Sequence, residues 1–241
     1  MKLQKIVLGV SAMMLSLNVF AVDLTRNEIE QKLKSSNKTN IVDFRRKDFR
    51  TLNLSKLDFR NADLWGTDLR DANLDDSDLS NLNLDLTVMT RIHFSRANLS
   101  NTSIFGVSMM DSDLSGANLS GSRFIANLDR ANLKGANLTN ANWGVDMKNQ
   151  PMGLMRVSLN GANLSNANLT GANLNRALMK RVDLTGANLN GTDLTMADLS
   201  GSHLENVNFK GANLNGTKFG FIKDKSIFNG ALNVNAAIFE D

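Results

Sequence analysis

A large apolar residue recurs at every fifth position of this 241-residue chain from residue 44 onward, and this period constrains the fold more than any other feature. A small or modest apolar residue stands two positions before each large one, and the position between them is mostly Asp or Asn. We call the large residue the centre of its repeat. The centres of the first half are Phe44, Phe49, Leu54, Phe59, Leu64, Leu69, Leu74, Leu79, Leu84, Met89, Phe94, Leu99, Ile104, Met109, Leu114, Leu119 and Phe124.

A period of five fits neither an α-helix, which repeats every 3.6 residues, nor a long strand, which alternates every two. It fits a chain that turns a corner in each repeat, with the centre and the residue two positions before it both pointing inward. Four such sides close a coil of about twenty residues, and stacked coils bury one continuous apolar column. Because no coil buries its apolar face alone, stability comes from its neighbours.

Residues 117–121 (ANLSG), 162–166 (ANLSN) and 187–191 (ANLNG) resemble the pentapeptide repeat family. The resemblance extends over roughly residues 42–221. It implies an all-β fold, a right-handed quadrilateral β-helix, with the centres and the small residues before them inside. We therefore expect one repeat domain over residues 41–221, with about nine coils and a length of about 40 Å at the usual strand spacing.

The repeat frame slips twice. Leu128 follows Phe124 after four residues instead of five, and the new frame continues to Trp143. Residues 144–151 contain no clear centre and include the only proline, and Leu154 and Leu159 resume a frame in step with the first half. We interpret 144–151 as a small bulged loop that supplies one extra residue. This interpretation is compatible with a functional loop and with a tolerated irregularity.

Residues 1–21 have the features of a signal peptide. Lys2 and Lys5 precede an apolar run, and cleavage is expected after Ala21. An uncleaved anchor is the alternative, but the run is short for a spanning helix, and no later segment is apolar enough to span a membrane. Cleavage lowers the formal net charge from +3 to +1. We therefore expect a periplasmic or secreted protein that does not span a membrane.

Both ends of a coil stack expose backbone edges, which natural proteins usually cover. In residues 22–40 we expect a short capping helix and a linker, because Thr25 and Glu28 have the spacing of a capping box. Residues 222–241 contain degenerate repeats and are expected to form a C-terminal cap. The family resemblance leaves a second reading open, in which the C-terminal end makes a homodimer contact.

Residue content argues against an enzyme. The chain has no Cys and only two His, His93 and His203, which the repeat places about five coils apart on the surface. The many Asp residues fill one repeat position, where a short polar side chain can bond the backbone of the corner. We expect no catalytic residue, no metal site and no cofactor. Nucleic acid is not an expected partner, because phosphate binding needs a clustered excess of Lys and Arg.

Apolar residues at outward positions are the remaining signal. A contiguous exposed apolar patch is a candidate contact surface, and Trp and Phe commonly anchor interfaces. The alternative is scattered surface hydrophobic residues, which are normal in soluble proteins. The candidate partner surface consists of Trp65, Leu86, Val88, Phe105, Met110 and Ile125.

These features favour a non-enzymatic, exported scaffold that presents a rigid rod to an unidentified protein partner. An alternative comes from the family resemblance, because some pentapeptide repeat proteins mimic DNA, bind bacterial type II topoisomerases such as gyrase, and protect them from quinolones. That mechanism needs a strongly acidic face and a cytoplasmic location, whereas this chain is nearly charge-balanced. A third reading, a glycan-binding or envelope-associated rod, rests on the expected compartment and on exposed Asn, Thr and Trp.

Overall fold

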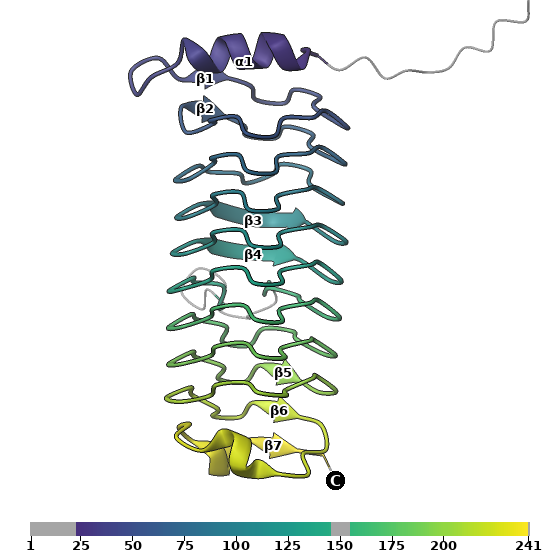
Figure 1. Cartoon of the computed structure of the whole chain (residues 1–241), viewed down its shortest axis with the longest axis vertical. Coiled ribbons are helices and arrows are strands. Elements are labelled where there is room, and N and C mark those ends of the chain that lie inside the picture. Colours follow the sequence, from purple (N-terminus) through teal and green to yellow (C-terminus); the bar gives the residue numbers. More distant parts are fainter. Residues whose placement is uncertain (1–22, 146–154, 241) are drawn as a thin grey trace, which may run out of the picture.

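The computed structural model describes residues 23–145 and 155–240, which form an elongated stack of coils (Figure 1). Residues 1–21, expected to be a signal peptide, lie outside the described residues, as do Leu154 and most of 144–151. The elements are α1 (Arg26–Lys34), β1 (Val42–Asp43), β2 (Ala62–Asp63), β3 (Ser103–Ser108), β4 (Arg123–Asn127), β5 (Asp198–Leu199), β6 (Lys218–Phe219), the 3-10 helices η1 (Lys225–Phe228) and η2 (Val234–Ala236), and β7 (Ile238–Phe239).

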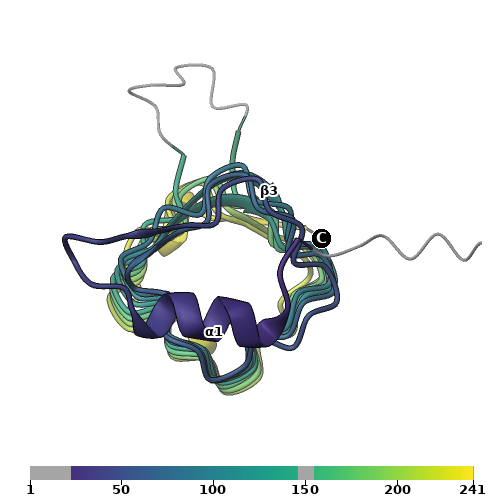
Figure 2. The ribbon, with the colours of Figure 1, turned by 90° about the horizontal axis from the view of Figure 1, so that it is seen from above.

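Successive coils pair in parallel, with residues twenty apart in register. β1 pairs with β2 through Val42 and Ala62, and isolated bridges such as the one between Asp48 and Asp68 continue the pattern along the stack. The backbone N–H of Phe44 donates to the carbonyl of Asp63 at 2.9 Å, so each coil hydrogen-bonds the next. Seen along the axis, the coils superpose around one interior (Figure 2). Five residues per side and twenty per coil give the four sides that the sequence predicted.

The repeat positions have the predicted roles. Centres such as Leu64 and Leu119 are fully buried, and so are small residues two positions earlier, such as Ala117. Asp58 illustrates the position between them, because its carboxylate accepts the backbone N–H of Arg60 at 3.0 Å. The residue two after most centres turns the corner at positive φ, which is 65° at Gly121. Glycine adopts this conformation without a steric cost.

One side of the stack carries a ladder of side-chain amides. The Nδ2 group of Asn137 donates to the Oδ1 atom of Asn118 at 3.2 Å, and Asn118 donates in the same way to Asn98 at 3.2 Å. Asn98 donates to the carboxylate of Asp78 at 3.1 Å. Each bond joins one coil to the coil before it, so the Asn position stabilises stacking as well as the corner.

The predicted four-residue step is confirmed. β3 pairs with β4 through Phe105 and Ile125, the register then shifts, and Val107 pairs with Ala126. The stack absorbs the missing residue at this bulge. Trp143 consequently stacks on Phe124 with ring centroids 4.8 Å apart and planes 7° apart.

The prediction for the second slip was wrong. Asn127 pairs with Ser158, so this coil contains thirty-one residues instead of twenty. The side that follows Trp143 is therefore centred on Leu159, and Leu154 is not needed as a centre. Eleven extra residues leave the same phase as one extra residue, because they differ by two whole repeats. Spacing alone could not distinguish them.

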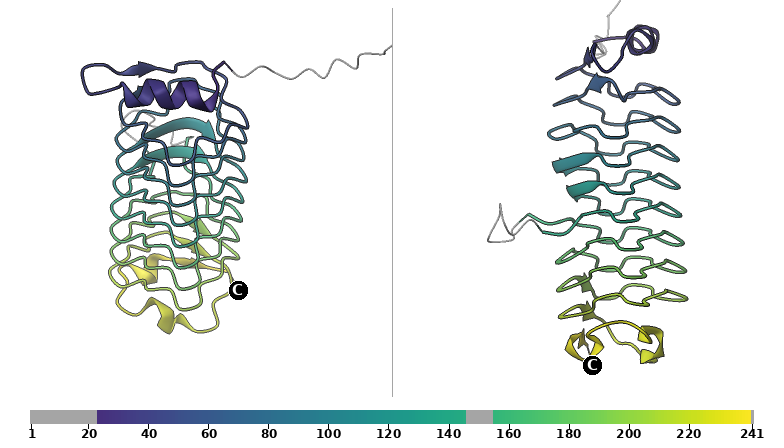
Figure 3. Two further views of the ribbon diagram at one scale, coloured as in Figure 1. Left: turned by 45° about the horizontal axis from the view of Figure 1, so that its top comes forward. Right: turned by 90° about the vertical axis from the view of Figure 1, so that its left-hand side faces the viewer.

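Additional segments lie at the two ends of the stack (Figures 1 and 3). Thr25 and Glu28 form the capping box of α1, and Ile29 and Leu33 are buried against the first coil. At the other end, β7 pairs with β6. Between these strands, η1 brings Phe228 into an aromatic cluster with Phe209, Phe219 and Phe239.

Candidate partner surface

Trp65 lies on the surface of the second coil, next to a cation. The guanidinium of Arg46, from the coil before, lies 5.1 Å from the centre of the indole ring. The backbone N–H of Arg46 donates to the carbonyl of Trp65 at 3.0 Å, which fixes the two corners relative to each other. Trp65 also lines a shallow hollow with Ile41, whose exposed fraction is 59%. The sequence argument missed Ile41 because it precedes the first recognisable repeat.

Four further predicted residues lie on the surface. Leu86 is 55% exposed, at a corner with a φ of 61°, and Val88 is 40% exposed on the adjoining side. Phe105 and Met110, one coil further along, are half-buried. We call Trp65, Leu86, Val88, Phe105 and Met110 the outward apolar patch. Asp85 interrupts its column between Trp65 and Phe105, as the sequence indicated.

Ile125 does not belong to the accessible surface, although its position in the repeat points outward. Its exposed fraction is 3%. It lies at the shortened side, where Ala126 follows directly and turns inward, and it lines a shallow hollow together with Met155. Met155 comes from the flank of the thirty-one-residue coil, whose length the sequence did not reveal.

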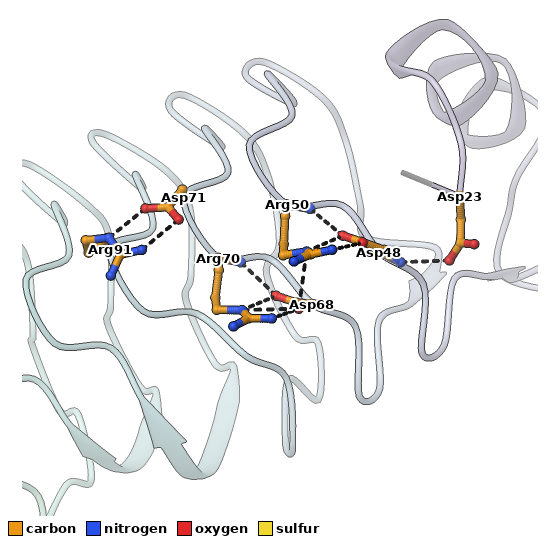
Figure 4. Close-up of polar contacts among 7 residues, drawn as sticks. All are labelled: Asp23, Asp48, Arg50, Asp68, Arg70, Asp71 and Arg91. Carbon is orange, nitrogen blue, oxygen red and sulfur yellow. Dashed lines mark hydrogen bonds and ion pairs between the residues drawn. The ribbon is translucent and has the colours of Figure 1, made fainter. Parts of the chain in front are cut away.

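A ladder of ion pairs runs along the side of the stack that also carries Val88 (Figure 4). The guanidinium of Arg50 lies 2.5 Å from Asp48 of its own coil and 3.6 Å from Asp68 of the next. Arg70 pairs with Asp68 at 2.5 Å. Further along, Arg91 reaches back one coil to Asp71 at 2.7 Å. Opposite charges therefore alternate along and across the coils, and they make a polar border for the apolar patch.

These contacts shift the acidities of the carboxyl groups. The hydrogen bond from the Arg45 side chain, followed by that from its backbone, lowers the pKa of Asp43 to about 2. The Arg50 side chain lowers the pKa of Asp48 in the same way, against an opposing effect of burial. These carboxylates are structural acceptors of hydrogen bonds. Within the described ranges, no group of three or more His, Cys, Asp or Glu side chains could hold a metal ion.

The two histidines lie in one column of the stack. His93 pairs with Asp113, and His203 pairs with Asp183, within the same series of bridges. Four intermediate residues of that column separate them, so they form no common site. In the part of the chain that the structure describes, no helix is long and apolar enough to cross a membrane.

The family model of pentapeptide repeats, in eight copies, matches residues 53–91, 92–125, 126–143, 158–195 and 194–221. No curated protein matches the chain. Among solved structures, trypsin-treated QnrB1, a plasmid-mediated fluoroquinolone resistance protein, is 18% identical, with a TM-score of 0.56. The match covers 80% of this chain and 89% of QnrB1. A likeness at this identity shows the fold alone.

A second solved structure is HetL, a pentapeptide repeat protein involved in heterocyst differentiation regulation from the cyanobacterium Nostoc sp. strain PCC 7120. It is 25% identical, with a TM-score of 0.46, and the match covers 80% of this chain and 96% of HetL.

Proposed function

Because this chain belongs to the pentapeptide repeat family, whose coils stack into a right-handed β-helix, we propose that it is an exported, non-enzymatic rod that binds a protein partner. One observation carries the proposal. The outward apolar patch replaces polar residues on two adjoining sides of the N-terminal half, and Leu86 is more than half exposed. Aromatic residues in an apolar patch with a polar border are common anchors of protein interfaces.

The partner surface is tested by site-specific crosslinking. A photoreactive residue at position 65 or 105 should give a discrete adduct in the fraction to which the protein is exported. The same residue in place of Lys134, which holds the equivalent repeat position on another side, should not give that adduct. The double variant Trp65→Ala with Phe105→Ala should keep the circular dichroism spectrum of the wild type and lose the partner. Unchanged partner recovery by this variant would contradict the assignment.

Export is the second part of the proposal, and it rests on residues 1–21. Their basic start and apolar run favour cleavage after Ala21, into the periplasm or the medium. The test is cell fractionation with N-terminal sequencing of the protein from its native host. A chain that begins at Val22 outside the cytoplasm is expected. A cytoplasmic chain that retains Met1 would refute export.

We assign the ends of the rod different roles in this proposal. α1 covers the first coil, where it buries Ile29 and Leu33. The C-terminal end is the candidate for a homodimer contact, because Phe221 is 74% exposed and Leu232 and Ile238 are about half exposed there. In analytical ultracentrifugation the wild type should sediment as a dimer and the variant Phe221→Asp as a monomer. A monomeric wild type would refute self-association without affecting the outward apolar patch.

DNA mimicry toward gyrase is the competing function, and the ion-pair ladder disfavours it. A DNA mimic presents unneutralised acidic groups, whereas Arg50 and Arg70 lie within hydrogen-bond distance of the carboxylates of Asp48 and Asp68. We therefore expect the purified protein to leave gyrase supercoiling unchanged. Inhibition at micromolar concentration would replace the exported-rod proposal by the topoisomerase one.

A further inference from the structure

Four Asn-Gly pairs occur in the chain, at residues 160–161, 190–191, 215–216 and 229–230. In such a pair the glycine nitrogen can attack the side-chain carbonyl carbon of asparagine, because glycine has no side chain to hinder the approach. The attack requires the peptide group between the two residues to rotate. The hydrogen bonds that hold this peptide group therefore decide how fast each pair reacts.

Three of the pairs lie at corners of the coil stack, and their peptide groups are held on both sides. The carbonyl of Asn160 accepts the N–H of Arg130 at 2.9 Å, and the N–H of Gly161 donates to Lys180 at 2.8 Å. Rotation of this peptide group would break a bond to each neighbouring coil. The other two pairs have the same arrangement, with each bond 2.9 Å long. The carbonyl of Asn190 accepts the N–H of Gly171, and the N–H of Gly191 donates to the carbonyl of Lys210. The carbonyl of Asn215 accepts the N–H of Met196, and the N–H of Gly216 donates to the carbonyl of Ala236.

Asn229 and Gly230 differ, because they follow η1 in the C-terminal segment that departs from the regular repeat (Figure 3). Neither the carbonyl of Asn229 nor the N–H of Gly230 makes a hydrogen bond to any residue in the described ranges. The Asn229 side chain is exposed and has no hydrogen bond there either. The flanking groups are held, since Asn229 N–H donates to Ser226 and Gly230 carbonyl accepts from Gly211. Within the described residues, no hydrogen bond holds the joining peptide group, so it can rotate.

We propose that Asn229 is a site of spontaneous deamidation and the fastest of the four Asn-Gly sites in the folded protein. The nitrogen of Gly230 bonds to Cγ of Asn229 and loses its proton, and the side-chain nitrogen leaves as ammonia. The product is a five-membered succinimide. Water then opens the ring at either carbonyl and gives aspartate or isoaspartate, without oxidation or reduction.

The reaction adds one carboxylate to the C-terminal end, and isoaspartate also adds a methylene group to the main chain. Deamidation would therefore weaken an apolar contact at this end, where Phe221 and Leu232 are exposed, because it adds a charge there. This consequence rests on the proposed homodimer, whereas the reaction at Asn229 does not.

The test is peptide mapping of the full-length folded protein after incubation in mildly alkaline buffer. Trypsin separates the four sites into peptides 157–176, 182–210, 211–218 and 226–241. Peptide 226–241 should gain the mass of deamidation at least about tenfold faster than each other peptide, because two backbone hydrogen bonds oppose rotation of the peptide group at each of the other sites. In concentrated urea the four rates should become similar.

Two controls make the result specific. The variant Asn229→Gln should abolish the mass gain of peptide 226–241, which also contains Asn233 and Asn235. Equal rates at the four sites of the folded protein would overturn the proposal. A preference for Asn229 that persists unchanged in urea would also overturn it, since the local sequence and not the fold would then be the cause. None of these outcomes depends on a binding partner.

Discussion

The stack of Trp143 on Phe124 offers the sharpest test of how the core is held together. Both side chains are fully buried, their rings are nearly parallel, and the indole N–H of Trp143 donates to the hydroxyl of Ser122 at 3.0 Å. Replacement of a buried Trp by Ala usually costs about 3–5 kcal/mol, because transfer free energy is lost and a cavity remains. Trp143→Ala should therefore lower the free energy of unfolding by about this amount.

The hydrogen bond contributes little to this loss. The hydroxyl of Ser122 also donates to the carbonyl of Leu119 at 2.6 Å, so it keeps a partner when the indole is removed. Trp143→Phe keeps a ring on Phe124 and should cost clearly less than Trp143→Ala. The stack itself is isolated by a double-mutant cycle of Trp143→Leu and Phe124→Leu, in which Leu is the commonest centre of the repeat. Its coupling energy should be about 0.5–1.5 kcal/mol.

Urea unfolding followed by far-ultraviolet circular dichroism measures all of these variants. The slope of the free energy of unfolding against urea concentration must be the same for all variants. Stacked repeats can lose cooperativity, and a changed slope would mean partial unfolding. A loss below about 1 kcal/mol for Trp143→Ala would refute the reasoning, since a filled interior does not tolerate such a cavity. Zero coupling in the cycle would show that the two rings are neighbours without a specific interaction.

Three further predictions follow from the repeat. Because the pKa of Asp43 is depressed, its contribution to stability is fully present above the unfolded pKa near 4 and is lost as pH falls toward about 2. Asp43→Asn should remove this part of the pH dependence from acid unfolding curves. Gly121→Ala should lower the melting temperature more than Gly191→Ala. Both glycines have positive φ, but only the Cβ added at Gly121 would collide with a neighbouring atom, Oδ1 of Asn101. Thr25→Ala should cost about 0.5–2 kcal/mol through loss of the α1 cap, measured by urea unfolding and rescued by Ser.

Most of the fold was predictable because each repeat position has one physical requirement. The centre must fill the interior, the residue before it must bond the corner, and the residue two after it must tolerate positive φ. Asp58 and Gly121 show that the last two requirements are met as expected. The capping box of Thr25 and Glu28 was equally readable, because it depends on local spacing alone.

The coil that follows Leu128 was not predictable in the same way. A phase judged modulo five cannot distinguish one inserted residue from eleven, so the side centred on Leu159 was assigned to the wrong place. The error also affected the candidate surface. Ile125 was expected outside, but the flank of the longer coil places Met155 beside it. Outward position in a repeat predicts exposure only where the adjoining coil has regular length.

The amide ladder gives the rod a net dipole along its axis. The side-chain N–H groups of Asn98, Asn118 and Asn137 all point toward the preceding coil, so their dipoles add head to tail instead of cancelling. Chains of such bonds polarise one another, and each bond strengthens the next. The positive end of this row meets the carboxylate of Asp78, a full negative charge, as an acidic residue meets the start of a helix. A nearly neutral molecule is thus polarised over these four coils by uncharged side chains.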